Sequence, residues 1–226
     1  MSFKQKVRTA RALLYRSLLN ARHSMLHPSY PPSVVHHVRG ERDLHRAETL
    51  ALALQRIETE GIPGHLAEVG VYRGQTSALL SRYARYRRLY LFDTFGGFPE
   101  GDLEAFQKGD ARFRNTDLDL VRQRVDPHAD VVFRVGRVPE SLAGLEEERF
   151  AFVLLDLDLL APTEASLAFF YPRLSPGGYL FVHDYNNPES QYACRRALDA
   201  FLKDKPEHVV EVADLWGSAL IRRVAC

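Results

Sequence analysis

The chain has 226 residues, a formal net charge of +1, 46% hydrophobic residues and 26% charged residues, values that are ordinary for a globular protein with a sizeable core. No run of 18 uncharged apolar residues occurs, and Lys and Arg residues punctuate the N-terminus, which argues against a membrane-spanning helix and a secretory signal. Cys194 and Cys226 lie too far apart for a metal-ligand spacing or a persuasive disulfide. We therefore expect a cytoplasmic protein.

The charge is unevenly distributed along the chain. Residues 1–40 carry seven of the 30 Lys and Arg residues and none of the 29 Asp and Glu residues. Apolar Val7, Leu14, Leu18 and Leu19 alternate with these basic residues and predict a basic amphipathic helix. We expect this helix to pack on its own domain or on a second copy in a homodimer, with contact to an anionic membrane or another partner as the alternative. We do not expect binding to nucleic acid, because no segment after residue 40 is notably basic.

A Pro- and His-rich segment, His27–His37, follows and must be irregular. Apolar residues at helical spacing then predict a helix over Asp43–Glu60, which ends before Gly61 and Pro63. We therefore divide the chain into a helical N-terminal extension with its connector, residues 1–42, and a main domain, residues 43–226.

A strand predicted over residues 65–70 runs into two glycines in the pattern Glu68-x-Gly70-x-x-x-Gly74, and a helix follows to about residue 84. The next strand, Leu89–Phe92, ends in Asp93. Glycines allow the backbone to approach a nucleoside closely, and an acid after the second strand can accept both ribose hydroxyls. A carboxylate at position 68 would repel a pyrophosphate but attract an ammonium or sulfonium group, so the pattern indicates an S-adenosylmethionine site; an ordinary strand–turn–helix is the alternative. The expected cofactor contacts here are Glu68, Gly70, Tyr72, Gly74, Asp93 and Thr94.

The rest of the chain alternates between predicted strands and helices. Strands are expected at residues 131–135, 150–155, 179–182, 209–212 and 218–224, and helices at about 117–125, 163–172 and 192–202, with a turn at Leu174–Gly178. Alternation implies parallel pairing through right-handed crossovers, whereas the last two strands are too close for a crossover and must form an antiparallel hairpin. We predict the Rossmann-like α/β fold of class I methyltransferases, a seven-stranded, mostly parallel sheet with an antiparallel C-terminal hairpin.

Polar residues follow two strands that we expect to be neighbours: Asp156 and Asp158 after one, and His183, Asp184 and Asn186 after the other. Ligands bind at the carboxyl ends of parallel strands, so these side chains should converge. Clustered carboxylates repel one another unless a cation such as Mg²⁺ binds. If the strand continues, the Asp-x-Asp spacing points both carboxylates the same way. One could then bind a metal ion while the other accepts a proton. The alternative is that the acids cap helices and His183 hydrogen-bonds to backbone.

Four segments carry a resemblance to a known family. They are Ala67-Glu-Val-Gly-Val-Tyr-Arg-Gly74, Phe92-Asp-Thr-Phe-Gly-Gly-Phe-Pro99, Leu154-Leu-Asp-Leu-Asp158 and Tyr171-Pro-Arg-Leu-Ser-Pro-Gly-Gly-Tyr-Leu-Phe-Val-His-Asp-Tyr185. Together with Trp216-Gly-Ser-Ala219, they resemble the TylF/MycF/NovP family of macrocin-type, S-adenosylmethionine-dependent O-methyltransferases, over roughly Asp43–Val224. The family acts on sugar hydroxyls of natural products.

The resemblance implies roles for the clustered acids. Asp156 corresponds to a metal ligand, and Asp158 to the general base. The family has paired acidic ligands after the fifth strand, whereas this chain has His183 and Asp184 there. Because Mg²⁺ prefers oxygen ligands, His183 could ligate a softer ion, or Asp184 and Asn186 could complete the ligand set without it. The departure bears on metal dependence rather than on cofactor binding.

We therefore expect the methyl group of S-adenosylmethionine to pass to a hydroxyl of a small-molecule or glycan acceptor, assisted by Mg²⁺ or another divalent ion. Gly136 and Arg137 are expected near the cofactor's adenine, Asp156 beside the cofactor as well as the metal, and Gly101–Thr116 over the substrate as a lid. One alternative is a metal-independent methyltransferase with His183 as catalytic base. Another is a non-catalytic module that uses the same fold to bind a partner.

Overall fold

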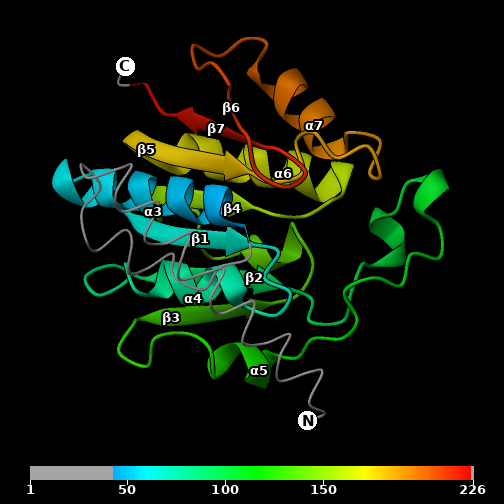
Figure 1. The fold of residues 1–226 in the computed structure, drawn as a ribbon, viewed down its shortest axis with the longest axis horizontal. Helices are drawn as coiled ribbons and strands as arrows, with labels where there is room; N and C mark the ends of the chain where they lie inside the picture. The colour runs from blue at the N-terminus through cyan, green and yellow to red at the C-terminus, as the bar shows by residue number, and fades with distance from the viewer. Residues whose placement is uncertain (1–42, 225–226) are drawn as a thin grey trace, which may run out of the picture.

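The computed structural model describes residues 43–224 and contains a seven-stranded sheet with the order β3-β2-β1-β4-β5-β7-β6 (Figure 1). The strands are β1 (His65–Val69), β2 (Leu89–Asp93), β3 (Val131–Val135), β4 (Phe150–Leu155), β5 (Leu174–Val182), β6 (Val210–Val212) and β7 (Ser218–Arg222). Strands β1 to β5 pair in parallel, and β7 pairs antiparallel with both β5 and β6. The predicted fold, including the C-terminal hairpin, is confirmed.

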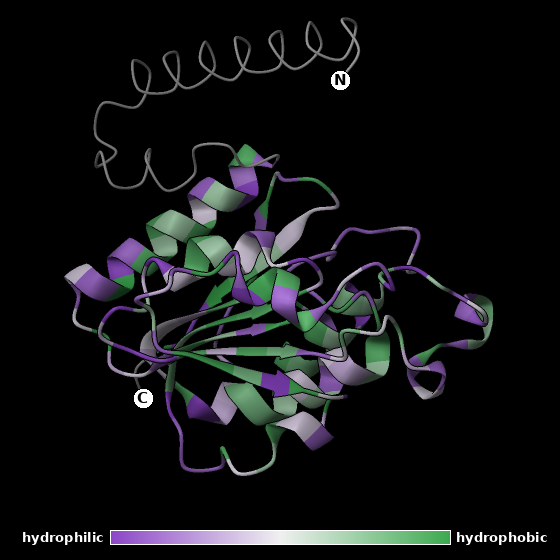
Figure 2. Cartoon of the chain, turned by 90° about the horizontal axis from the view of Figure 1, so that it is seen from below, coloured by the Kyte–Doolittle hydropathy of each residue, from purple (hydrophilic) through white to green (hydrophobic). Residues whose placement is uncertain are grey.

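Helices cover both faces of this sheet (Figures 1 and 2). The α-helices are α3 (Leu44–Thr59), α4 (Gln75–Ser81), α5 (Leu118–Arg122), α6 (Leu160–Phe170) and α7 (Ala193–Leu202). Short 3₁₀ turns are η1 (Glu100–Asp102), η2 (Ala105–Gln107), η3 (Glu140–Leu142) and η4 (Tyr171–Arg173). Two separate apolar clusters correspond to the two faces, one with α3, α4 and α5 and the other with α6 and α7.

Alternation along each strand divides the core between the two faces. In β1, Ala67 and Val69 pack on the side of α6 and α7, whereas Leu66 packs on the side of α3 and α4. Because side chains alternate with a period of two, Glu68 shares the face of Leu66. The strand pattern therefore buries Glu68 against α4, at the carboxyl end of β1.

The predicted turn at Leu174–Gly178 is wrong, because these residues already belong to β5. The pairing of β5 with β4 shifts register between Phe150 and Phe152, which accommodates the Pro-Gly-Gly sequence within the strand. A Cβ on Gly178 would lie 2.7 Å from the carbonyl oxygen of Ala151, so only glycine allows the two backbones to approach this closely. The following helix prediction needs a smaller correction, since α6 begins at Leu160, three residues earlier than expected.

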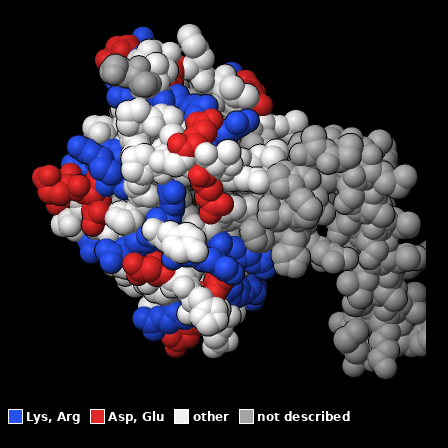
Figure 3. Space-filling model, turned by 90° about the vertical axis from the view of Figure 1, so that its left-hand side faces the viewer, with Lys and Arg blue, Asp and Glu red and all other residues white. Residues whose placement is uncertain are grey.

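Residues 100–116 project from the sheet edge at which the parallel strands end (Figure 1). This segment is tied to the body by ion pairs from Glu104 to Arg196 on α7 and, at 3.7 Å, from Arg112 to Glu189. The opposite side of the molecule carries interspersed basic and acidic side chains (Figure 3). The predicted N-terminal basic helix lies outside the described residues. Within residues 43–224, none of the helices is long and apolar enough to cross a membrane.

Candidate functional site

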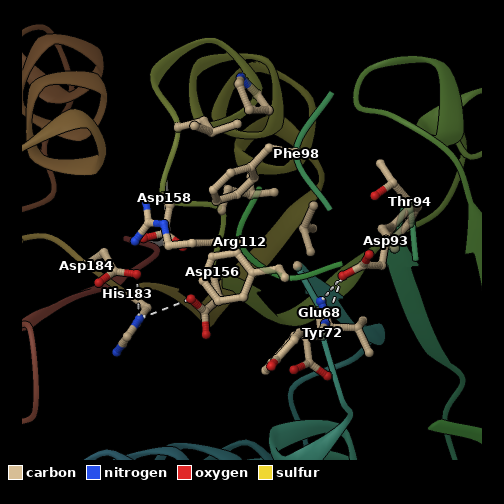
Figure 4. A pocket seen from close by; sticks show the side chains of 18 of the residues that line it. Glu68, Tyr72, Asp93, Thr94, Phe98, Arg112, Asp156, Asp158, His183 and Asp184 are labelled. Carbon is tan, nitrogen blue, oxygen red and sulfur yellow. Dashed lines mark hydrogen bonds and ion pairs between the residues drawn. The ribbon is translucent and has the colours of Figure 1, made fainter. Parts of the chain in front are cut away.

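A cavity of about 730 Å³ lies at the carboxyl ends of β1, β2, β4 and β5. Residues from α3, from the segment 98–113 and from the loop at Leu215 and Trp216 complete its wall. Of the predicted site residues, Glu68, Gly70, Tyr72, Asp93, Thr94, Gly136, Arg137, Asp156, Asp158, His183 and Asp184 all line this one cavity. Figure 4 shows two groups of side chains in this cavity. One contains Asp156, Asp158, His183 and Asp184, and the other contains Glu68, Tyr72 and Asp93.

The turn after β1 depends on Gly70. Its φ is +91°, and its N–H donates to the carbonyl of Phe92 at 2.9 Å. A Cβ on Gly70 would lie 1.9 Å from the carbonyl oxygen of Asp156, so any side chain would collide with the backbone that follows β4. Gly70 therefore permits both the turn and the contact between the two sides of the cavity.

Gly74, the second glycine of the motif, lies at the start of α4. It caps α4 with φ +74° but does not line the cavity. A Cβ at this position would lie 2.9 Å from the side chain of Val121 in α5. The second glycine of the motif thus serves the packing of α4 against α5.

Asp93 holds the loop that surrounds the predicted cofactor position. One carboxylate oxygen accepts the N–H groups of Val71 (2.7 Å) and Tyr72 (2.8 Å), and the other accepts that of Phe95 (2.6 Å). Thr94 acts similarly in the next turn, where its hydroxyl donates to the carbonyl of Gly97 at 2.7 Å. Both side chains line the cavity and also fix its backbone.

Glu68 and Arg137 both line the cavity. The carboxylate of Glu68 is 1% exposed and accepts the hydroxyl of Ser77 at 2.5 Å. Burial raises its pKa well above the usual range, an effect that the Ser77 hydrogen bond and Arg46 offset in part and that the charges of Asp156 and Asp93 increase. Arg137 forms an ion pair with Asp102 of η1, which links the end of β3 to the projecting segment.

On the other side of the cavity, Asp156, His183 and Asp184 form one cluster (Figure 4). Nδ1 of His183 lies 3.0 Å from Oδ1 of Asp156 and 2.9 Å from Oδ2 of Asp184. Each member also has a partner outside the cluster. Oδ2 of Asp156 lies 3.3 Å from Arg46, Oδ1 of Asp184 accepts the amide of Asn187 at 3.0 Å, and Nε2 of His183 lies 3.2 Å from the carbonyl oxygen of Leu215.

The charges in this cluster stabilise one another. Burial alone would raise the pKa of Asp156, but His183 and Arg46 outweigh it and lower the pKa to about 2. Burial alone would lower the pKa of His183, but the carboxylates of Asp156 and Asp184 raise it to about 11. The arrangement therefore favours ionised carboxylates around a positive charge.

Asp158 reaches the cavity by a route that the strand pattern does not predict. Strand β4 ends at Leu155, so the strand does not continue through Asp156 and Asp158, and the condition under which their carboxylates would point the same way is not met. Asp158 instead adopts a left-handed backbone conformation with φ +58°, which Asp tolerates better than most residues. Its side chain is buried and makes no hydrogen bond to the described part of the chain. Burial raises its pKa to about 8, and the charges of Asp184 and Asp156 act in the same direction against the guanidinium of Arg112.

Asn186 does not join the cluster. Its amide donates to Glu211 at 2.8 Å, and its oxygen accepts from Arg195 at 3.0 Å. The neighbouring Asn187 takes the position beside Asp184 because the chain turns at Asp184, whose φ is +56°. The choice between Asn186 and Asn187 depends on this turn, which the strand pattern leaves open.

Several cavity residues escape prediction from the sequence. Arg46 comes from α3, 110 residues before its partner Asp156, and nothing in the helical pattern distinguishes it from the other polar residues of that helix. Arg112 lies in the projecting segment, where it packs near the rings of Phe98 and Phe113. Leu215 contributes only its carbonyl oxygen to His183, a contact that any residue type could make.

Comparison with known proteins places this chain in a family. Residues 4–217 match the TylF family, described as macrocin-O-methyltransferase. A relative from Streptomyces olivaceus, 8-demethyl-8-(2,3-dimethoxy-alpha-L-rhamnosyl)-tetracenomycin-C 4'-O-methyltransferase, is 32% identical over 184 residues, which are 74% of this chain and 67% of the relative. Mycinamicin III 3''-O-methyltransferase from Micromonospora griseorubida is 28% identical over 188 residues, 75% of this chain and 71% of that protein.

The fold has counterparts among solved structures. The O-methyltransferase NovP superposes with a TM-score of 0.69 at 24% identity, over 80% of this chain and 81% of that one. At this identity the likeness concerns the fold alone, whereas the sequence matches concern the family.

Proposed function

The chain belongs to the TylF macrocin-O-methyltransferase family and is an S-adenosylmethionine-dependent O-methyltransferase, and from this premise we propose its acceptor and the roles of its residues. The acceptor is a hydroxyl of a sugar unit, or of another small molecule with vicinal hydroxyls, in natural-product or glycan biosynthesis. The name of the first sequence relative describes 4'-O-methylation of a product that carries a 2,3-dimethoxy-rhamnosyl group, and the name of the second describes 3''-O-methylation of mycinamicin III.

One observation carries this proposal: the glycine turn and the acidic cluster open into the same cavity. Methyl transfer requires that the donor sulfur and the acceptor oxygen meet in line, with a base beside the oxygen. A volume of about 730 Å³ falls in the range of small-molecule sites.

On the cofactor side, Glu68 binds the ammonium group and the backbone at Gly70 and Tyr72 lies along the nucleoside. Asp93 keeps one carboxylate oxygen with a single described hydrogen bond, so that oxygen is available to a ribose hydroxyl. Thr94 supports the same loop, and Gly136 and Arg137 lie where the adenine would end.

The residues of the cluster fit a divalent cation. Adjacent ligands of an octahedral ion bonded at about 2.1 Å lie about 3 Å apart. Nδ1 of His183 has this separation from an oxygen of Asp156 (3.0 Å) and from one of Asp184 (2.9 Å), and one ligand atom from each of the three residues lies within 4.8 Å of the others. These three residues would hold the ion. When bound, a divalent ion, Mg²⁺ or another, would lower the pKa of an acceptor hydroxyl.

Asp158 acts as the general base. It is buried, faces the cavity and has a pKa raised to about 8, which is close to the pH at which proton transfer is efficient. The acceptor oxygen attacks the methyl carbon, the carbon–sulfur bond breaks toward S-adenosylhomocysteine, and the hydroxyl proton passes to Asp158. Arg112, from the segment that would cover the acceptor, limits the rise in the pKa of Asp158.

The metal-independent alternative assigns the base to His183. Both ring nitrogens of His183 face acceptors, Nδ1 two carboxylates and Nε2 the carbonyl of Leu215. With a pKa raised to about 11, this imidazole would hold its protons at neutral pH. We therefore assign the base to Asp158, and His183 would serve as a ligand once the ion displaces the proton from Nδ1.

The proposal is tested in two steps. Calorimetry with S-adenosylhomocysteine should show binding to the full chain, and labelled S-adenosylmethionine should then transfer its methyl group to a vicinal-diol glycoside. EDTA should abolish methyl transfer without reducing the binding of S-adenosylhomocysteine. Transfer that survives EDTA and is lost in His183→Ala but not in Asp156→Ala would favour His183 as base. The absence of product binding would favour a non-catalytic module.

A further inference from the structure

Resting on the proposed function, we propose that His183 ligates the metal through Nδ1 and makes this cluster select a first-row transition-metal ion over Mg²⁺. The argument depends on how the three side chains divide their atoms between the cluster and its surroundings.

Each of the three residues turns one atom inward and one outward. Asp156 directs Oδ1 to the common point and Oδ2 to Arg46, and Asp184 directs Oδ2 inward and Oδ1 to Asn187. His183 follows the same rule, with Nδ1 inward and Nε2 at Leu215. Ligands of protein metal sites are oriented in this way by outer partners, because a fixed side chain loses less entropy when the ion binds.

The outer contact of His183 decides which ring nitrogen can ligate. A carbonyl oxygen accepts but never donates, so the Leu215 contact at 3.2 Å requires a hydrogen on Nε2. Nδ1 faces two carboxylate oxygens, which also only accept, so it carries a hydrogen in the metal-free cluster. A bound ion would displace that hydrogen and leave Nδ1 as the ligand atom, while the hydrogen on Nε2 stays with the Leu215 carbonyl. The backbone of Leu215 is itself held, because its N–H donates to Asp43, the capping residue of α3, at 2.8 Å.

The resulting donor set is one imidazole nitrogen and two carboxylate oxygens. Mg²⁺ prefers oxygen ligands and keeps water rather than accept a nitrogen, whereas Fe²⁺, Co²⁺, Ni²⁺ and Zn²⁺ bind imidazole well. A single nitrogen among oxygens therefore shifts the relative affinities toward the transition metals. An aspartate at position 183 would remove this preference while it keeps an inward-facing ligand.

Calorimetry of the full chain with Co²⁺ and with Mg²⁺ measures the preference. Transition metals bind most sites more tightly than Mg²⁺, so the informative quantity is the change in the Co²⁺ to Mg²⁺ affinity ratio between the wild type and His183→Asp. We expect the ratio to fall at least about tenfold. His128→Asp, an identical substitution on the exposed surface, should leave it unchanged. Quenching of the single tryptophan, Trp216, which follows Leu215 and lines the cavity, gives a second readout of Co²⁺ binding.

Pulsed electron paramagnetic resonance of the Mn²⁺-loaded wild type tests the ligand directly and does not depend on a variant that folds. Coupling of the electron spin to one imidazole nitrogen is expected, and its absence would overturn the inference. An unchanged affinity ratio in folded His183→Asp would do the same. Methyl transfer, measured in parallel, separates the outcomes: transfer that proceeds equally well with Mg²⁺ and without nitrogen ligation leaves the proposed function standing and refutes only the metal preference.

Discussion

The two sides of the cavity are built by different means. On the cofactor side, backbone geometry dominates: Gly70 makes the turn, and Asp93 gathers three backbone N–H groups. On the acceptor side, charged side chains dominate: Asp156 and His183 each have a partner from a distant segment, and Asp184 is supported by the nearby Asn187. The first construction is local in the sequence, whereas the second is assembled from α3, the ends of β4 and β5, and the loop before β7.

This difference has a physical reason. A nucleoside is recognised by shape and a few hydrogen bonds, which a tight backbone turn supplies without strong charges. Activation of an alcohol requires charge held in a low-dielectric place, and charge of this kind is stable only where several groups compensate it. The acceptor side should therefore respond to charge substitutions. The cofactor side should respond mainly to substitutions that change shape, with the exception of Glu68, whose carboxylate binds the ammonium group.

The largest expected effect concerns the acceptor side alone. Asp158→Asn should lower kcat by about 10²–10⁴-fold, because it removes the general base while it keeps the size of the side chain. Binding of S-adenosylhomocysteine should remain close to that of the wild type, as measured by calorimetry. Asp130→Asn, which removes an exposed carboxylate paired with Arg88, serves as the control and should leave kcat unchanged. A comparable loss in both variants would argue against the assignment.

Gly70→Ala tests whether the two sides share a backbone contact. The positive φ costs about 1–3 kcal/mol and the collision with Asp156 a similar amount, so the variant should unfold at clearly lower temperature and bind the cofactor product poorly. Gly61→Ala is the control, because φ is also positive there but nothing lies within 4 Å of the new Cβ. Its thermal melt therefore measures the cost of the positive φ without a collision. If both variants melt alike, the contact with Asp156 contributes little.

Glu68→Gln separates cofactor binding from stability. Loss of the carboxylate should weaken S-adenosylhomocysteine binding by about 10–100-fold, the usual value of a hydrogen bond to a charged group. Burial raises the folded pKa of Glu68 above its unfolded value, so its favourable contribution is present below the unfolded pKa and is lost as pH rises through the folded one. The Tm of the variant minus that of the wild type should therefore be higher at pH 8 than at pH 5. A difference in Tm that is the same at both pH values would contradict this.

Asp43→Ala should have the smallest effect. The side chain of Asp43 connects α3 to the loop that contacts the acceptor side. The side chain caps α3 through the N–H of Arg46 and holds the N–H of Leu215, so its loss should cost about 1 kcal/mol of stability. Because Leu215 orients His183, Co²⁺ affinity should fall by about tenfold, whereas cofactor binding should not change. Asp117→Ala removes the cap of α5 alone and should lower stability without affecting Co²⁺. Equal metal affinity in both variants would count against the orienting role of Leu215.

Residue patterns along the chain are enough to predict the elements of the sheet and the residues of the cofactor side. Periodicity placed strands β3 and β4 at their observed bounds, and the glycine spacing with Glu68 and Asp93 identified the turn, because these signals act between residues close in the chain. The strand pattern also predicted that Asp156, His183 and Asp184 lie at one edge of the sheet, since parallel neighbouring strands end together.

The completion of the acceptor side depends instead on how distant segments pack together. Asp158 enters the cavity through a left-handed turn, Asn187 rather than Asn186 supports Asp184, and Arg46 and the carbonyl of Leu215 arrive from distant segments. No pattern of residue types encodes a backbone carbonyl or the exit angle of a strand. Packing of α3 and of the loop before β7 against the sheet sets both, so the charge balance around His183 emerges only once the chain has folded.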